Sequence, residues 1–268
     1  MKTVTIAHRQ LTIAYDDAGA GPPVLLLHAF PLDRAMWQNQ VTALAGEFRV
    51  LAPDLPGFGE SGELVEGFTM SAVADVAADF LSAVGVVAPA TVVGLSMGGY
   101  IALSFAYRQP QRLRGLVLAD TQAEPDDAAA KEGRAKTINL VMEKGAAGLI
   151  ETMLPKLLAE QTRSVQPAIV EEVQTMAARQ SVVAITAAVN GLRERPDAGP
   201  FLQWITVPTL VIVGEHDAIT PPEAARSLAE KIPQARLVTI PGAGHLSNLE
   251  APAAFNVALL AFLRTLPA

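Results

Sequence analysis

The sequence predicts an α/β protein whose central sheet is mostly parallel and carries helices on both faces. Short, continuous runs of apolar and β-branched residues recur along the chain, as strands buried on both faces require. Helical patterns alternate with these runs, and such alternation is typical of parallel sheets. The chain has 268 residues, of which 50% are hydrophobic, which is enough for a large buried core.

Eight strands are expected, of which the first two form an N-terminal hairpin. The predicted strand ranges are 2–7, 10–15, 24–28, 49–54, 91–94, 115–120, 209–214 and 236–240. Helices are expected between them, and several begin near a serine or proline that suits a first helical turn. The predicted helical ranges are 35–45, 70–84, 97–108, 222–231 and 252–266.

One interval interrupts this alternation. No strand pattern occurs between Asp120 and Val207, and helical patterns occupy 128–144, 146–158, 167–179 and 182–193 instead. A crossover between parallel strands needs only ~10–12 residues. We therefore predict a core formed by residues 1–120 and 207–268, with residues 121–206 inserted as a helical cap.

Composition excludes several classes of function. The formal net charge is −7, which argues against nucleic acid or an anionic membrane as the main partner. Without cysteine there is no disulfide and no thiol nucleophile. We expect no cofactor and no metal, because no H-E-x-x-H pattern or paired ligand spacing occurs. A monomer or small homo-oligomer acting on a small molecule is the expected form.

Two stretches bear on localisation. The first residues alternate like a strand and lack the apolar segment of a secretory signal. Residues 80–107 contain no charge, but glycines and a proline interrupt them and their period changes midway, which argues against a membrane span. The prediction is a cytoplasmic protein without a membrane-spanning segment.

A candidate nucleophile follows the predicted strand at 91–94. Residues 94–98 read Gly-Leu-Ser-Met-Gly, which matches G-x-S-x-G and lies where a buried strand passes into a helix, as that motif requires. The glycines let strand and helix approach closely while Ser96 adopts a strained turn that exposes its hydroxyl.

Serine needs a base, and the base needs an orienting carboxylate. His245 is the candidate base, because it alone of four histidines follows a strand in a glycine-rich loop near the end of the chain. Asp217, just past the strand at 209–214, is the candidate acid, with Glu215 and Asp120 as rivals. The order Ser96, Asp217, His245 suits the G-x-S-x-G context.

The chain resembles the α/β-hydrolase fold family over nearly its whole length. Within that family it is most similar to small cap-bearing bacterial carboxylesterases and to 3-oxoadipate enol-lactonase-like hydrolases. The resemblance is carried by residues 28–33 (HAFPLD), 54–61 (DLPGFGES), 94–99 (GLSMGG), 214–217 (GEHD) and 242–250 (GAGHLSNLE).

The resemblance also implies an oxyanion hole formed by two backbone N–H groups. They belong to Met97, after the nucleophile, and to Phe30, in the first loop. Ala29 stands where the family usually has glycine, so the loop must keep a negative φ there. Such donors stabilise the transition state by ~3–4 kcal/mol each.

Residues 57–62 also match the dinucleotide-binding pattern G-x-G-x-x-G. No helix opens at this motif, so we interpret it as a tight turn instead. His28 is interpreted as a structural residue that joins neighbouring loops.

The predicted activity is hydrolysis of a carboxylic ester of a small-to-medium, mainly neutral substrate. Enol-lactone hydrolysis is the alternative, and it would require a cation facing Ser96 from the cap. A non-catalytic binding protein of the same fold is the remaining possibility. The residues expected to contact substrate are Met142, Met153, Leu154, Ile219 and Leu246.

Overall fold

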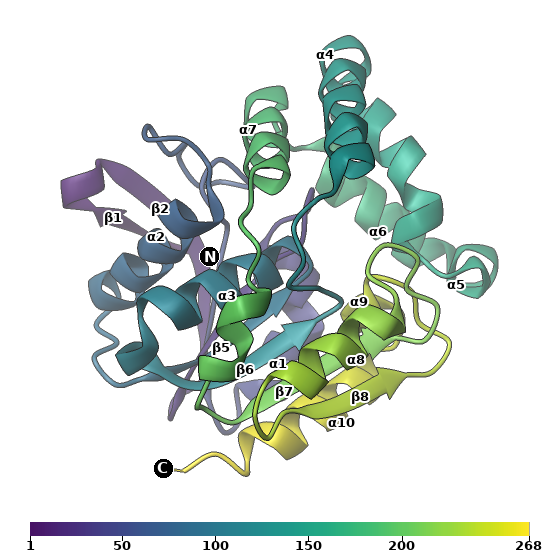
Figure 1. The fold of residues 1–268 in the computed structure, drawn as a ribbon. Coiled ribbons are helices and arrows are strands. Elements are labelled where there is room, and N and C mark those ends of the chain that lie inside the picture. The colour runs from purple at the N-terminus through teal and green to yellow at the C-terminus, as the bar shows by residue number, and fades with distance from the viewer. Residues whose placement is uncertain (268) are drawn as a thin grey trace.

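The computed structural model describes residues 1–267, which form an eight-stranded sheet (Figure 1). Ala268, the last residue of the predicted core range, lies outside the described residues. The strands are β1 (Lys2–Ile6), β2 (Leu11–Ala18), β3 (Pro23–Leu27), β4 (Arg49–Pro53), β5 (Ala90–Leu95), β6 (Leu113–Ala119), β7 (Thr209–Gly214) and β8 (Arg236–Ile240). Each lies within a few residues of its predicted range.

The sheet is mostly parallel, as predicted. The order is β1-β2-β4-β3-β5-β6-β7-β8. β2 pairs antiparallel with β1 and with β4, and every later pair is parallel. The parallel strands therefore end at one common edge, which is where α/β sheets place their functional loops.

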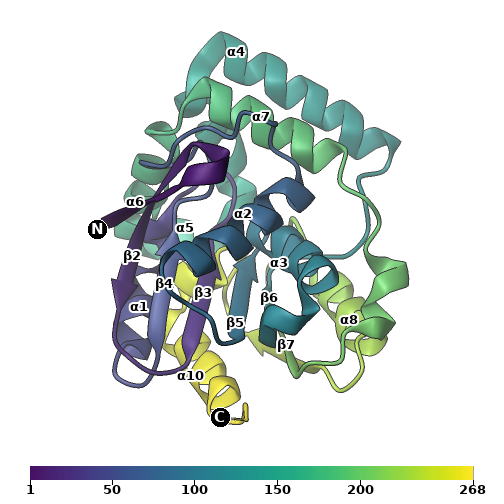
Figure 2. The same cartoon turned by 90° about the vertical axis from the view of Figure 1, so that its left-hand side faces the viewer.

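Helices cover both faces of this sheet (Figure 2). Alternate residues of strands β3 to β7 enter two separate apolar clusters: Leu25 and Leu27 contact the α2, α3 and α8 side, whereas Val24 and Leu26 contact the α1 and α10 side. This period of two is the reason for the continuous apolar runs. The core helices are α1 (Gln38–Leu44), α2 (Met70–Ala83), α3 (Met97–Arg108), α8 (Pro222–Lys231), α9 (Ser247–Glu250) and α10 (Pro252–Leu263).

Four helices between β6 and β7 lie above the edge at which the parallel strands end (Figures 1 and 2). They are α4 (Ala128–Leu157), α5 (Glu160–Val165), α6 (Pro167–Ala178) and α7 (Val182–Arg193). Gly145 has non-helical φ and ψ of 66° and −169°, which divides α4 into two halves. These halves match the two helices predicted at 128–144 and 146–158. We refer to residues 121–206 as the cap segment.

Short 3₁₀ helices complete the chain at η1 (Ala7–Arg9), η2 (Arg34–Trp37), η3 (Pro110–Arg112) and η4 (Gly199–Trp204). The predicted helix at 35–45 is thus η2 followed by α1. The uncharged stretch 80–107 consists of the end of α2, then β5, then α3. Within residues 1–267, no helix combines the length and apolar character needed to cross a bilayer.

Close packing at the β5–α3 junction depends on glycine. A Cβ on Gly98 would lie 2.1 Å from the Leu27 carbonyl oxygen, and one on Gly94 would lie 2.1 Å from the Gly98 carbonyl oxygen. Because both obstacles are backbone atoms, a side chain would have to push α3 away from β3 and β5.

We therefore expect Gly98→Ala to lower the free energy of unfolding by about 1–3 kcal/mol, as overpacking does. The matched control is Gly46→Ala, where an added Cβ meets nothing within 4 Å. Urea unfolding of both variants measures the difference. Equal stability of the two would show that the junction has room to spare.

Candidate active site

Ser96 occupies a strained turn between β5 and α3. Its φ and ψ are 55° and −114°, a backbone conformation that costs a non-glycine residue about 1–3 kcal/mol. The surrounding structure holds this turn: the Ser96 N–H donates to the Ala119 carbonyl (2.9 Å), and the Thr121 hydroxyl donates to the Ser96 carbonyl (3.0 Å). Ser96 as a residue is half-buried.

The structure brings Ser96, His245 and Asp217 together in a continuous chain of hydrogen bonds. His245 Nε2 lies 2.8 Å from Ser96 Oγ. On the other side of the ring, His245 Nδ1 lies 2.9 Å from both carboxylate oxygens of Asp217. When Nδ1 donates to the carboxylate, Nε2 is left as an acceptor for the serine proton.

Asp217 is held as an anion by its surroundings. Burial alone would raise its pKa, but the charge and hydrogen bond of His245 and the hydrogen bonds of Thr220 outweigh burial and lower the pKa. Oδ1 accepts from the N–H groups of Ile219 (2.8 Å) and Thr220 (3.0 Å), and Oδ2 accepts from the Thr220 hydroxyl (2.8 Å). Thr220 was not predicted, although the spacing D-x-x-T is typical of such a local turn.

The two rival carboxylates lie elsewhere. Glu215 is half-exposed and accepts from the Gly242 N–H (2.9 Å). Asp120 is fully buried and accepts from the Gly214 N–H (2.8 Å) and the Ser247 hydroxyl. Neither is hydrogen-bonded to His245. Burial, together with the charge of Asp217, raises the pKa of Asp120 well above its ordinary value.

This raised pKa predicts a pH-dependent stability. Because the folded state binds the Asp120 proton more tightly, stability from this group is present below about pH 4 and is lost as the pH rises through the folded pKa. Asp120→Asn cannot ionise: its amide oxygen can accept from the Gly214 N–H, and its NH₂ group can donate to Ser247 Oγ in place of the bond that the Ser247 hydroxyl donates to Asp120. The stability of this variant relative to the unsubstituted protein should therefore increase between pH 4.5 and pH 8, measured by urea unfolding. A difference that does not vary with pH would contradict this assignment.

Of the two predicted oxyanion donors, Met97 follows Ser96 directly in the chain. Met97 is the first residue of α3, so its N–H has no partner within the helix. The close approach of Gly98 to the Leu27 carbonyl places this end of α3 against the loop that carries Phe30. Within residues 1–267, neither the Phe30 nor the Met97 N–H donates to a protein acceptor. Ala29 is not among the positive-φ residues, as its side chain requires.

His28 orients the peptide that carries the Phe30 N–H. Its Nε2 accepts from the Leu55 N–H (2.9 Å), so Nδ1 donates to the Ala29 carbonyl (3.0 Å). Burial lowers the pKa of His28 and keeps the ring neutral. Because the C=O and N–H of a trans peptide point in opposite directions, this bond directs the Phe30 N–H away from His28. His28 therefore joins neighbouring loops, as predicted.

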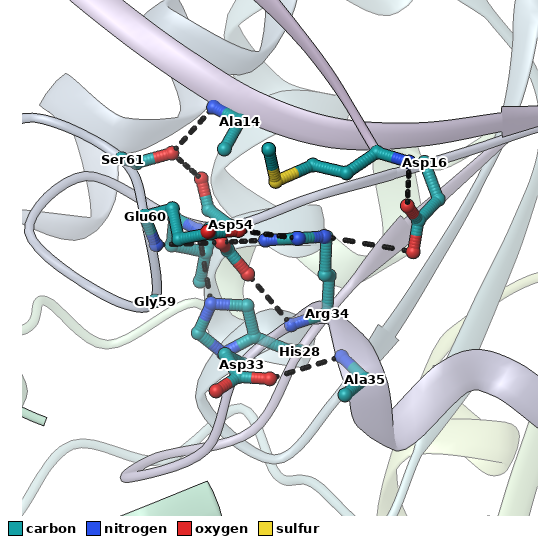
Figure 3. A network of polar contacts seen from close by, with 12 residues as sticks. Ala14, Asp16, His28, Asp33, Arg34, Ala35, Asp54, Gly59, Glu60 and Ser61 are labelled. Carbon is teal, nitrogen blue, oxygen red and sulfur yellow. Dashed lines mark hydrogen bonds and ion pairs between the residues drawn. The ribbon is translucent and has the colours of Figure 1, made fainter. Parts of the chain in front are cut away.

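The glycine motif at 57–62 forms a turn around a buried carboxylate (Figure 3). Asp54 accepts from the N–H groups of Arg34 (2.9 Å) and Glu60 (2.9 Å) and pairs with the Arg34 guanidinium. Gly59 has a φ of +54°, and a Cβ there would lie 2.2 Å from Asp54 Oδ2. No helix begins between Gly57 and Met70, where α2 starts, so the motif lacks the helix N-terminus that a dinucleotide site uses.

Comparison with known proteins identifies the family. The profile of the alpha/beta hydrolase family matches residues 24–258. The chain belongs to this family.

Its relatives include several hydrolases. The structure of a thermophilic esterase from Thermogutta terrifontis is 42% identical, with a TM-score of 0.94 over 98% of this chain and 97% of that one. The 3-oxoadipate enol-lactonase 2 of Acinetobacter baylyi is 29% identical over 97% of this chain and 96% of its own length. A pimeloyl-acyl-carrier-protein methyl ester esterase of Chromobacterium violaceum is 31% identical over 95% and 99%.

The residues expected to contact substrate fall into two groups in this alpha/beta hydrolase. Met153, Leu154 and Ile219 are half-buried and, with the fully buried Leu246, belong to the apolar cluster next to the His245 loop. Met142 does not join them, because its side chain is 69% exposed on α4. Val141, the preceding residue, is buried instead, and contact of Met142 with substrate stays a prediction.

A cavity of about 220 Å³ lies beside α3. Tyr100, one helical turn after Ser96, forms part of its wall, together with Leu103 and Phe201. Arg195 also lines it, but this guanidinium stacks on the Tyr100 ring at 4.3 Å and pairs with Asp126. Arg195 therefore brings no uncompensated charge to the wall of this cavity.

Proposed function

We propose that this alpha/beta hydrolase is a serine hydrolase that cleaves carboxylic esters of small-to-medium, mainly neutral substrates. The observation that carries the proposal is the hydrogen-bonded chain from Ser96 through His245 to Asp217. A serine hydroxyl held 2.8 Å from a histidine that an anion orients is the arrangement required for acyl transfer.

The proposed reaction has two steps. Ser96 Oγ attacks the ester carbonyl while His245 accepts its proton, and the N–H groups of Met97 and Phe30 stabilise the oxyanion. His245 then returns the proton to the departing alkoxide, which leaves an acyl-enzyme. In the second step a water molecule attacks the acyl carbonyl while His245 takes its proton, and His245 passes that proton to Ser96 Oγ as the carboxylic acid leaves.

The five cations considered in the cap segment are either paired with carboxylates or exposed to solvent, which favours a neutral substrate over a carboxylate-bearing lactone. Arg134 pairs with Asp126 (2.9 Å), and Arg179 pairs with Asp33 (2.5 Å). The remaining candidates, Lys144, Lys156 and Arg163, are exposed to solvent. None of these five is a buried cation without a partner, which a bound carboxylate would need. Lactone opening remains the second candidate, because the enol-lactonase relative matches nearly the full chain.

Three measurements test the proposal. A p-nitrophenyl ester series from acetate to octanoate should give burst release of p-nitrophenol, and a serine-directed phosphonate should label Ser96 alone. The preference for a neutral substrate is tested with two methyl esters of adipic acid. At pH 7, kcat/KM for the neutral dimethyl adipate should be about tenfold higher than for the anionic monomethyl adipate, which corresponds to about 1.4 kcal/mol. No burst and no labelling would reject serine hydrolysis. A preference for the monoester would favour the carboxylate-bearing substrate.

A further inference from the structure

A buried carboxylate lies beneath the loop that carries the candidate base. Glu250, the last residue of α9, is only 6% exposed. Its Oε1 accepts from the N–H groups of Gly244 (2.9 Å) and Leu246 (3.3 Å), the two residues that flank His245. These bonds fix the backbone on both sides of the imidazole.

The same carboxylate reaches into the cap segment. Glu250 Oε2 accepts from the Ala159 N–H (2.8 Å) and the Thr162 hydroxyl (2.7 Å), at the junction of α4 and α5. A Cβ on Gly244 would lie 2.5 Å from the Ala159 nitrogen, so loop and cap segment are in direct contact. We call Glu250 with its four donors the base clamp.

A second buried carboxylate connects the cap segment to the loop that carries Phe30, which we call the oxyanion loop (residues 28–33). Asp33 lies three residues after Phe30 and accepts from Arg179 Nε (2.6 Å), Arg179 Nη2 (2.5 Å) and Gln180 Nε2 (2.9 Å) at the end of α6. Gln180 Oε1 accepts in turn from the Gly59 N–H (2.8 Å). We call Asp33 with Arg179 and Gln180 the oxyanion clamp.

We propose that Glu250 and Asp33 are positioning residues that couple the cap segment to the two catalytic loops. The base clamp sets His245 against Ser96, and the oxyanion clamp sets the Phe30 N–H. Neither carboxylate is hydrogen-bonded to Ser96, so each acts through its loop. The proposal rests on the proposed function for its kinetic consequence, whereas the coupling itself is a property of the fold.

The two clamps can be weakened separately from the cap side. Thr162→Val removes one donor to Glu250, and Arg179→Gln removes the guanidinium donors to Asp33. The control for the first is Thr152→Val on α4, because the Thr152 hydroxyl donates only to the Gly148 carbonyl of its own helix. Glu250→Gln is the stronger variant, because its amide NH₂ group would face two of the four donors.

Amide hydrogen exchange tests the coupling without any assay of activity. Thr162→Val and Glu250→Gln should speed exchange in residues 242–250 and leave 28–33 unchanged, whereas Arg179→Gln should do the reverse. Thr152→Val should change neither segment. Exchange that is unaltered in both segments, or raised equally in both by every variant, would overturn the proposal.

Kinetics with p-nitrophenyl acetate test the consequence for catalysis. We expect Glu250→Gln to lower kcat by about 10²-fold with little change in KM, as small misplacements of catalytic groups do, and to slow phosphonate labelling of Ser96 in parallel. A lower melting temperature with unchanged kcat and labelling would reduce Glu250 to a purely structural residue. Absence of activity in the unsubstituted protein would reject the proposed function and leave the exchange result to decide the clamps.

Discussion

Ser96→Ala should lower kcat by about 10⁶-fold while KM and the fold are retained. In the proposed mechanism the substitution removes the atom that forms the bond to the acyl group, and it leaves His245 Nε2 without the hydroxyl that lies 2.8 Å away. Loss of a triad nucleophile has an effect of about this size in serine hydrolases. Steady-state hydrolysis of p-nitrophenyl acetate and active-site titration measure it.

The backbone of Ser96 supplies a control for this experiment. Alanine keeps the Cβ and therefore the strain at a φ of 55°, so Ser96→Ala should unfold at nearly the same urea concentration as the unsubstituted protein. Ser96→Gly should have a free energy of unfolding about 1 kcal/mol higher than that of Ser96→Ala, because glycine adopts this conformation without steric cost. If Ser96→Ala retained activity, Ser96 would not be the nucleophile. If Ser96→Gly were no more stable than Ser96→Ala, the turn would be unstrained.

The core of the fold could be predicted because local pattern and tertiary environment agree. Strands buried between two helical layers must be apolar at every position, so their runs are visible in the sequence. Strand boundaries are harder to predict where a polar residue interrupts the apolar run. β6 begins at Leu113, before the predicted 115, and so includes the charged Arg114, whose side chain donates to the Pro267 carbonyl (2.7 Å).

Two short helices were not predicted, because they are too short to show a sequence pattern. α5 has six residues and α9 has four, which is too few to show a helical period. Both helices depend on contacts with distant parts of the chain. The Thr162 hydroxyl of α5 donates to Glu250 at the end of α9, so these two helices support each other across a separation of 88 residues.

The central residues of the candidate site could be inferred because each follows a different strand of the parallel sheet. Ser96 follows β5, Asp217 follows β7, and His245 follows β8, and parallel strands bring their carboxyl ends together. Contacts with the cap segment have no such rule. Met142 lies in the run Ile138–Met142, where apolar residues occupy several directions around the helix, so only the packing of α4 decides that Val141 is buried and Met142 exposed.

Asp217→Asn should lower kcat by about 10⁴-fold, the second largest effect expected. The reason lies in the donors around the carboxylate. The N–H groups of Ile219 and Thr220 both point at Oδ1, so the asparagine oxygen must occupy that position. Its NH₂ group then replaces Oδ2, where it leaves the Thr220 hydroxyl without an acceptor and can donate to His245 Nδ1. That donor favours the tautomer with the ring proton on Nε2, which cannot accept the proton of Ser96.

Asp120→Asn is the matched control, because Asp120 is an equally buried carboxylate at the end of β6 that bonds Gly214 and Ser247 instead of His245. We expect its kcat to stay within about tenfold of the unsubstituted protein, since no hydrogen bond to the imidazole changes. The comparison decides which acid orients the base. A large loss in Asp120→Asn with a small loss in Asp217→Asn would transfer the role to Asp120. Equal losses would mean that the two carboxylates, whose charges already influence each other, act on His245 as one unit.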